Sequence, residues 1–145
     1  MALIDGLADN QKRKKLVDNC TTLLDEQVAA KSGISGLAIK AGYAAIKGIS
    51  PRYCAGAIER LLPESFAVLD PLWDEGLQTG DPVKHITNNS SRTADLLLSI
   101  TDIRIKKSNN TAVKGVYNKL RNSAKQHIEE AVPSLAKVID EYDKN

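Results

Sequence analysis

The sequence predicts an all-α protein, and three observations lead to that prediction. Apolar residues recur at spacings of three and four over most of the chain, as they do along one face of a helix. Serine, aspartate, glycine and proline stand between these runs, where they typically begin or end helices. No run of β-branched residues alternates with polar ones, as it would in a strand. The 145 residues are therefore expected to form a single helical domain over residues 1–145, a bundle of about six or seven helices.

The first three helices are predicted from their end signals. Asp9 is a good N-cap for a helix of about twenty residues, which ends by Gly33. A second helix is expected over residues 34–49, where Gly48 closes it. Ser50–Pro51 then starts a third, because serine caps well and proline suits the first helical position.

The next helices follow similar signals. Asp70–Pro71 and Asp81–Pro82 repeat the start pattern. The apolar spacing continues across the first of these, so Pro71 either kinks one helix or divides two. A further helix is expected from Ser91 to near Lys107, followed by a turn at residues 108–110.

The C-terminal third has the longest helical pattern. Its apolar stripe runs from Val113 to Tyr142 without a break. We predict one long helix that bends at Pro133, with two helices meeting near Asn122 and Ser123 as the alternative. The length of this stripe also suggests that one small domain leaves part of it for a partner.

Residues 31–51 read KSGISGLAIKAGYAAIKGISP and are unusually rich in small residues. On a helical wheel they are apolar nearly all round, and only Lys40 and Lys47 share a polar direction. Such a helix is typical of the middle of a bundle. We therefore expect residues 34–49 to form a small-residue central helix, the most buried element, which its neighbours approach closely.

Other interpretations of residues 31–51 fail on specific residues. A membrane span would need about eighteen or more apolar residues, and the lysines interrupt this one. A phosphate-binding loop needs Gly-Lys-Ser/Thr after a strand, and neither is present. A DNA-reading helix needs polar side chains at its start, whereas this one offers Ser35, Gly36, Leu37 and Ala38.

Composition favours a soluble cytoplasmic protein. The N-terminus lacks the pattern of a signal peptide, and Cys20 and Cys54 occupy apolar positions, as free thiols do in a reducing compartment. No Cys/His cluster has the spacing of a metal site, and no cofactor motif occurs, so neither a metal nor a cofactor is expected.

The net charge of +2 conceals strong segregation. Residues 61–103 carry seven acids and two bases, whereas residues 104–127 carry seven bases and no acid. One interpretation is an anion-binding face for nucleic acid or an acidic membrane surface. The other is a solvated surface that balances the acidic middle of the chain. The candidate anion-binding residues are Arg104, Lys106, Lys107, Lys114, Lys119, Arg121 and Lys125.

Four polar residues on otherwise apolar helix faces are candidates for a pocket between helices, namely Tyr43, Tyr53, Thr101 and His127. His127 lies near the edge of the C-terminal stripe and has no nucleophile or carboxylate linked to it by a motif. A packing role therefore fits it better than general base catalysis.

Three runs resemble a family of small uncharacterised all-helical bacterial proteins, a domain of unknown function. They are SGISGLAIKAGYAAIKGISPRY, RLLPESF with PLW, and TADLLLSITDIRIKKSNNTAVKGVYNKLRNSAKQHIEEAVPSLAKVID. The resemblance covers about residues 16–139 and implies a bacterial cytosolic protein with no assigned activity. It supplies no functional residues.

These observations predict an interaction or scaffold domain rather than an enzyme, with a homodimer as a candidate assembly. Polyanion binding through residues 104–127 is the first alternative, and a small-ligand binder with a pocket between helices is the second.

Overall fold

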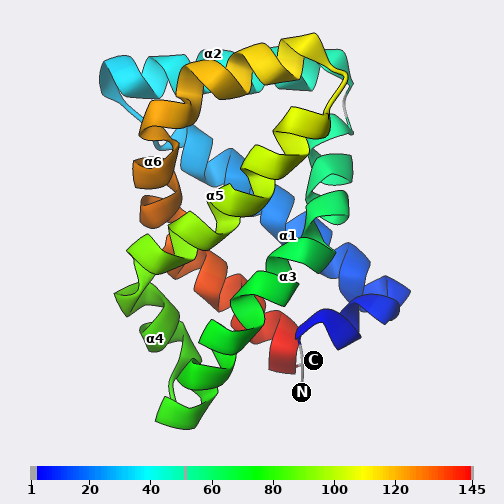
Figure 1. Cartoon of the computed structure of the whole chain (residues 1–145), viewed down its shortest axis with the longest axis vertical. Helices are drawn as coiled ribbons and strands as arrows, with labels where there is room; N and C mark the ends of the chain where they lie inside the picture. Colours follow the sequence, from blue (N-terminus) through cyan, green and yellow to red (C-terminus); the bar gives the residue numbers. More distant parts are fainter. Residues whose placement is uncertain (1–2, 51, 145) are drawn as a thin grey trace.

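The chain is helical almost throughout in a computed structural model that describes residues 3–50 and 52–144 (Figure 1). Its elements are η1 (Leu3–Ala8), α1 (Asn10–Ala29), α2 (Gly33–Ile49), α3 (Tyr53–Thr79), α4 (Pro82–Asn88), α5 (Ser90–Lys107) and α6 (Thr111–Lys144), of which η1 is a 3-10 helix. No strand occurs among the described residues, so the all-α prediction is confirmed.

Helix α6 organises the arrangement, since it packs against α1, α2, α4 and α5. Helix α3 packs against η1, α1, α4 and α5. At one end of the molecule, α2 lies across the others together with the first part of α6 (Figure 1). At the opposite end, η1 meets the last turns of α6. The molecule thus has an α2 end and an end where its first and last helices meet.

Two of the predicted helix starts are confirmed by their capping bonds. The Asp9 carboxylate accepts hydrogen bonds from the backbone N–H groups of Gln11 and Lys12, at 3.0 and 3.2 Å. Asp81 accepts one from the N–H of Lys84 at 3.0 Å, and Pro82 follows as the first residue of α4. These bonds satisfy N–H groups that have no partner inside a helix.

Pro71 does not divide two helices, because α3 continues through it. The start signal at Asp70 was therefore misleading. Its carboxylate accepts a hydrogen bond from the backbone N–H of Leu3, at 3.0 Å, and so holds η1 instead of capping a helix. The predicted start at Ser50–Pro51 involves Pro51, which lies outside the described residues.

Helix α6 is one helix with Pro133 inside it, rather than two. The direction of α6 changes between its gold and orange parts in Figure 1. The Ser123 hydroxyl donates a hydrogen bond to the Leu120 carbonyl at 3.2 Å. Such a bond from a serine to its own helix commonly bends the helix.

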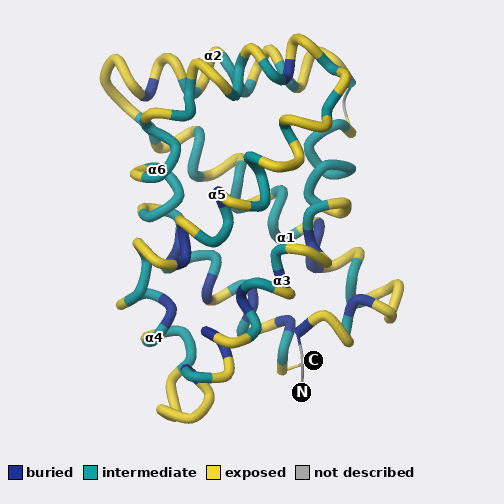
Figure 2. The backbone as a smooth tube through the Cα atoms, in the orientation of Figure 1, coloured by how far each residue is buried: buried dark blue, intermediate teal, exposed yellow. Residues whose placement is uncertain are grey.

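The core lies at the end where the first and last helices meet (Figure 2). Trp73 of α3 is fully buried there, and its indole N–H donates to Asp143 at 3.1 Å. From α6 the core receives Val132 and Ala136, both also fully buried. The remaining buried members come from η1, α1, α3, α4 and α6, and they are Leu3, Leu7, Leu16, Val17, Leu62, Phe66, Leu69, Leu72, Ile86, Ile139 and Tyr142.

The prediction that residues 34–49 form a central, most buried helix is wrong. Helix α2 is an outer element, and Gly36 is its only residue classed as buried. Ile34 and Leu37 expose 90% and 68% of their surface. The apolar pattern is real, but apolar periodicity does not say what covers each face, and only one face of α2 is covered by this chain.

The predicted close helix approach does occur, at Gly42. A Cβ atom placed on Gly42 would lie 2.9 Å from Val116 Cγ1 and 3.1 Å from Leu120 Cδ1. Gly42→Leu is therefore expected to lower the free energy of unfolding by about 1–3 kcal/mol through overpacking. Ala45→Leu, on the exposed side of the same helix, serves as the matched control and should change it by less than about 0.5 kcal/mol. Urea unfolding measures both, and equal effects would contradict the placement of α2.

Tyr142 joins the last turns of α6 to η1, because its hydroxyl donates a hydrogen bond to the Leu3 carbonyl at 2.7 Å. Burial, followed by the charges of Asp143 and Asp5, raises the pKa of Tyr142 to about 12. The ordinary value of about 10 applies in the unfolded chain. The folded state therefore holds this proton more tightly, and its contribution to stability is lost as pH rises from about 10 through 12.

Tyr142→Phe is expected to cost about 1 kcal/mol at neutral pH through loss of this hydrogen bond. The variant should also lose less stability than the parent between neutral pH and about pH 11, because Phe does not ionise. Urea unfolding at the two pH values measures this. Tyr53→Phe is the control, and a parallel pH dependence of parent and Tyr142→Phe would contradict the assignment.

Candidate anion-binding surface

Two stretches of the chain contain no Asp or Glu, and the fold brings them together. Residues 27–58 carry four bases and residues 103–128 carry seven. Helix α2 belongs to the first stretch and the beginning of α6 to the second, and they are in contact at Gly42, Val116 and Leu120. We call the part of the molecule formed by residues 27–58 and 103–128 the basic end.

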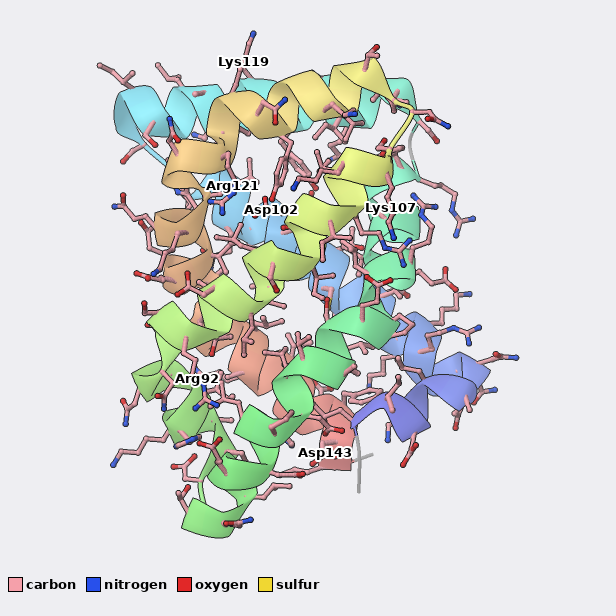
Figure 3. All side chains as sticks on the ribbon, in the orientation of Figure 1. Arg92, Asp102, Lys107, Lys119, Arg121 and Asp143 are labelled. Atoms are coloured by element: carbon pink, nitrogen blue, oxygen red, sulfur yellow. The ribbon has the colours of Figure 1, made fainter. Side chains whose placement is uncertain are left out.

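Arg121 is held by a bidentate ion pair with Asp102 of α5 (Figure 3). Arg121 Nε lies 2.9 Å from Asp102 Oδ1, and Nη2 lies 3.0 Å from Oδ2. The Tyr117 hydroxyl donates to the same Oδ1 at 2.5 Å. The bonds from Arg121, and then from Tyr117, lower the pKa of Asp102. Because Nε and Nη2 of Arg121 both donate to Asp102, this pair positions α6 on α5. The same bonds leave Arg121 less free to bind an anion.

Two more of the predicted bases are paired. Arg104 contacts Glu64 of α3, with Nη2 at 2.8 Å from Oε1. Lys125 Nζ lies 3.1 Å from Asp95 Oδ1 of α5. The acids come from residues 61–103, so part of the basic block does balance the acidic middle of the chain, as the second sequence interpretation proposed.

The edges of α2 are also attached by ion pairs. Lys31, just before the helix, lies 2.7 Å from Glu130 of α6 and lowers the pKa of that carboxyl. Near the other end, Lys47 lies 3.3 Å from Asp25 of α1. The Tyr43 hydroxyl donates to the same carboxylate. This bond, followed by that from Lys47, lowers the pKa of Asp25.

The remaining bases of the basic end have no carboxylate within salt-bridge distance among residues 3–50 and 52–144. All are exposed except Lys114, which is half-buried. They are Lys40, Arg52, Lys106, Lys107, Lys114 and Lys119. Figure 3 shows Lys119 projecting away from the body of the protein.

The four polar residues predicted to share a pocket lie in separate places. Tyr43 faces Asp25 of α1, and Thr101 bonds Tyr117 between α5 and α6 at 2.9 Å. His127 meets the start of α2, whereas Tyr53 is half-buried in the first turn of α3. Two hollows open on the surface, one along residues 88–99 and one between α1 and the end of α6. None of the four residues lines either hollow.

His127 and Ser35 are in hydrogen-bond contact, with Nε2 of His127 3.1 Å from the Ser35 hydroxyl. A serine and a histidine in contact also occur in hydrolytic triads. Its Nδ1 is buried and has no hydrogen-bond partner among the described residues. In a serine nucleophile system, a third group bonds this nitrogen and fixes the imidazole tautomer. The contact therefore joins α2 to α6 without the arrangement of a hydrolytic triad.

Sequence reasoning missed the contribution of Lys40 and Arg52. Helix α2 was expected in the core, so Lys40 was not added to the bases of residues 104–127, and Arg52 lies just after that helix. The missing signal was present in the sequence, since residues 27–58 lack acids entirely. It could be used only by knowing that this stretch packs beside the other one.

Two further features are absent from residues 3–50 and 52–144. No cluster of three or more His, Cys, Asp or Glu side chains there could hold a metal ion. In the same part of the chain, no helix combines the length and the apolar character that crossing a membrane requires.

The fold and its surface define an all-helical protein with one strongly basic end. The chain belongs to the family of unknown function DUF6918, which it matches over residues 3–143. The resemblance to an uncharacterised domain family is thereby confirmed. No curated protein and no solved structure matches the chain.

The Asp102–Arg121 pair predicts a pH-dependent contribution to stability. The folded-state pKa of Asp102 is lowered, so the contribution is present above the unfolded value of about 4 and is lost as pH falls through the folded pKa. About a third of the Asp102 side chain is exposed, so Asp102→Asn is expected to cost only about 0.5–1 kcal/mol at neutral pH. Urea unfolding should show this difference disappearing toward about pH 2. A difference independent of pH would contradict the role of the charge.

Proposed function

We propose that this protein is an interaction protein that docks on a phosphate-bearing polyanion through its basic end. The observation that carries the proposal is the juxtaposition of the two acid-free stretches, residues 27–58 and 103–128. They are separate in the sequence, and helix α2 of the first stretch packs against the beginning of α6 in the second.

The charges on this end exceed what the fold uses. Five of its eleven bases pair with acids of α1, α3, α5 and α6, and six have no such partner in the described chain. Unpaired exposed ammonium and guanidinium groups attract phosphate oxygens and release counterions on binding. The acidic stretch 61–103 lies mainly on α3, α4 and α5, so the charge distribution orients the molecule toward an anionic surface.

A homodimer was expected because the apolar stripe of α6 is long for one small domain. Every member of the stripe is nevertheless buried or half-buried within the chain, covered by α1, α2, α4 and α5. The structure therefore supports the polyanion interpretation better than a dimer through α6.

Charge removal on the basic end tests the proposal. Lys40, Lys114 and Lys119 changed together to Gln should weaken binding to duplex DNA and to anionic vesicles at low salt by tenfold or more. If each lysine neutralises one phosphate, the slope of log affinity against log salt for DNA should become shallower by about 2.7. Fluorescence anisotropy with labelled DNA measures the affinity for DNA and its dependence on salt.

The matched control changes three exposed lysines outside the basic end, Lys14, Lys84 and Lys137, to Gln. It removes the same charge and should leave most of the affinity. Glu64→Gln, which frees Arg104 from its ion pair, should raise the affinity. Equal weakening by the two triple variants would show that only net charge matters, and no binding by the parent would refute the proposal.

A further inference from the structure

The outward face of α2 is apolar, which is the reverse of the usual arrangement for a surface helix. Ile34 exposes 90% of its surface, Leu37 68% and Ile49 41%. These are large side chains, and water does not solvate them favourably. The smaller members of the same exposed surface are Ala38, Ala41, Ala45 and Gly48.

Helix geometry shows that this is one continuous face. At about 100° per residue, Ile34, Leu37 and Ala41 lie within about 60° of one another. The covered residues Ile39, Gly42 and Ile46 lie about 80–140° from Ile34 around the helix. The exposed apolar face therefore points in a different direction from the face that packs on α6.

The total surface of the protein fits an uncovered face. The chain of 15.7 kDa exposes 8315 Å², whereas a monomer of this mass exposes about 7,300 Å² by the usual scaling. In Figure 2 the exposed stretches are conspicuous along α2, and the buried ones gather at the other end.

Charge distinguishes between the occupants that could cover this face. No acid occurs from residue 27 to residue 58. Lys40 and Lys47 lie along one edge of the apolar face, and Lys119 of α6 projects at the same end (Figure 3). An apolar strip edged by lysines is the pattern of a helix that lies in the interface of an anionic membrane.

We propose that α2 docks on the surface of an anionic lipid bilayer, with its axis parallel to the membrane plane. Ile34, Leu37 and Ile49 reach the boundary of the acyl chains, and the alanines between them allow close approach. Lys40 of α2 and Lys119 of α6 extend their stems and place their ammonium groups among the lipid phosphates, whereas Lys47 stays paired with Asp25 of α1. This inference rests on the proposed function and specifies the polyanion.

The alternative occupants fit less well. A second copy of the chain placed on α2 would bring two basic ends together, and like charges oppose that contact. A nucleic acid would present phosphates and bases to an apolar strip that has no exposed aromatic ring on which bases could stack. A bilayer satisfies both features, because it offers phosphates beside hydrocarbon.

Vesicle co-sedimentation of the full chain tests the proposal. The protein is expected to bind vesicles of phosphatidylcholine and phosphatidylglycerol in equal parts, and to bind phosphatidylcholine vesicles at least tenfold more weakly. Ile34→Ser with Leu37→Ser should weaken binding to the mixed vesicles by at least tenfold, because the apolar contribution is lost. Both residues are exposed, so circular dichroism and the melting temperature should match the parent.

The control variant combines Ile4→Ser with Leu77→Ser, an exposed isoleucine and leucine outside α2. It should bind the mixed vesicles as the parent does. As a second measurement, Leu37→Trp should shift its fluorescence to shorter wavelength on these vesicles, whereas Leu77→Trp should not. The natural Trp73 is fully buried and contributes a constant background.

The outcomes separate the two proposals. If the parent binds mixed vesicles and DNA, but Ile34→Ser with Leu37→Ser changes neither, the basic end binds polyanions and the insertion of α2 is refuted. Binding to DNA alone likewise refutes the membrane inference and leaves the proposed function standing. Absence of binding to vesicles and DNA refutes both. A dimer that this double variant dissociates would identify a second copy as the occupant and overturn the inference.

Discussion

The positions of α2 and of the first part of α6 depend on the packing of the second half of α6 into the core. Val132 and Ala136 are fully buried in the same core as Trp73 of α3. Two hydrogen bonds, from Tyr142 to Leu3 and from Trp73 to Asp143, then tie the end of α6 to η1 and α3. Because α6 continues as one helix out of this core, its first part is held at the far end of the molecule. That part is what α2 packs against.

The two ends of the molecule are stabilised differently. The core end buries large apolar side chains from five elements. At the α2 end, few residues are fully buried, and much of the attachment is polar. It consists of the pairs of Lys31 with Glu130 and Lys47 with Asp25, and the contact of Ser35 with His127. Exposed pairs of this kind contribute little each. Stability is concentrated away from the surface that we assign to binding, as is common for functional surfaces.

The sequence predicted the helices well because their determinants are local. Asp9 and Asp81 bond the N–H groups next to them, so composition and order suffice to place those helix starts. Asp70–Pro71 shows the limit of the same argument. The dipeptide is equally suited to starting a helix, but Asp70 bonds Leu3, which is 67 residues away, and the apolar face continues into the core through Phe66 and Trp73. A tertiary contact decided between two outcomes that the local signal allowed.

The candidate site was predictable only in part, for the same reason. The block of bases at residues 104–127 is visible in the sequence, but which of them are free depends on α3 and α5. Glu64, Asp95 and Asp102 neutralise three of the seven predicted bases. The fold in turn adds Lys40, from a helix that was expected in the core, and Arg52, which follows that helix.

The error about α2 and the omission of its lysines have one origin. The apolar face of a helix can be covered by other helices of the same chain or by a lipid bilayer. A sequence pattern does not distinguish between these two. Lys40 lies in the polar direction of this helix, and a lysine stem that crosses apolar surface can carry its ammonium group to water or to lipid phosphate. The free energy that drives the apolar face away from water is the same in the two cases. Only the arrangement of α6 beside α2 favours the second, because six bases at that end have no carboxylate partner among the described residues.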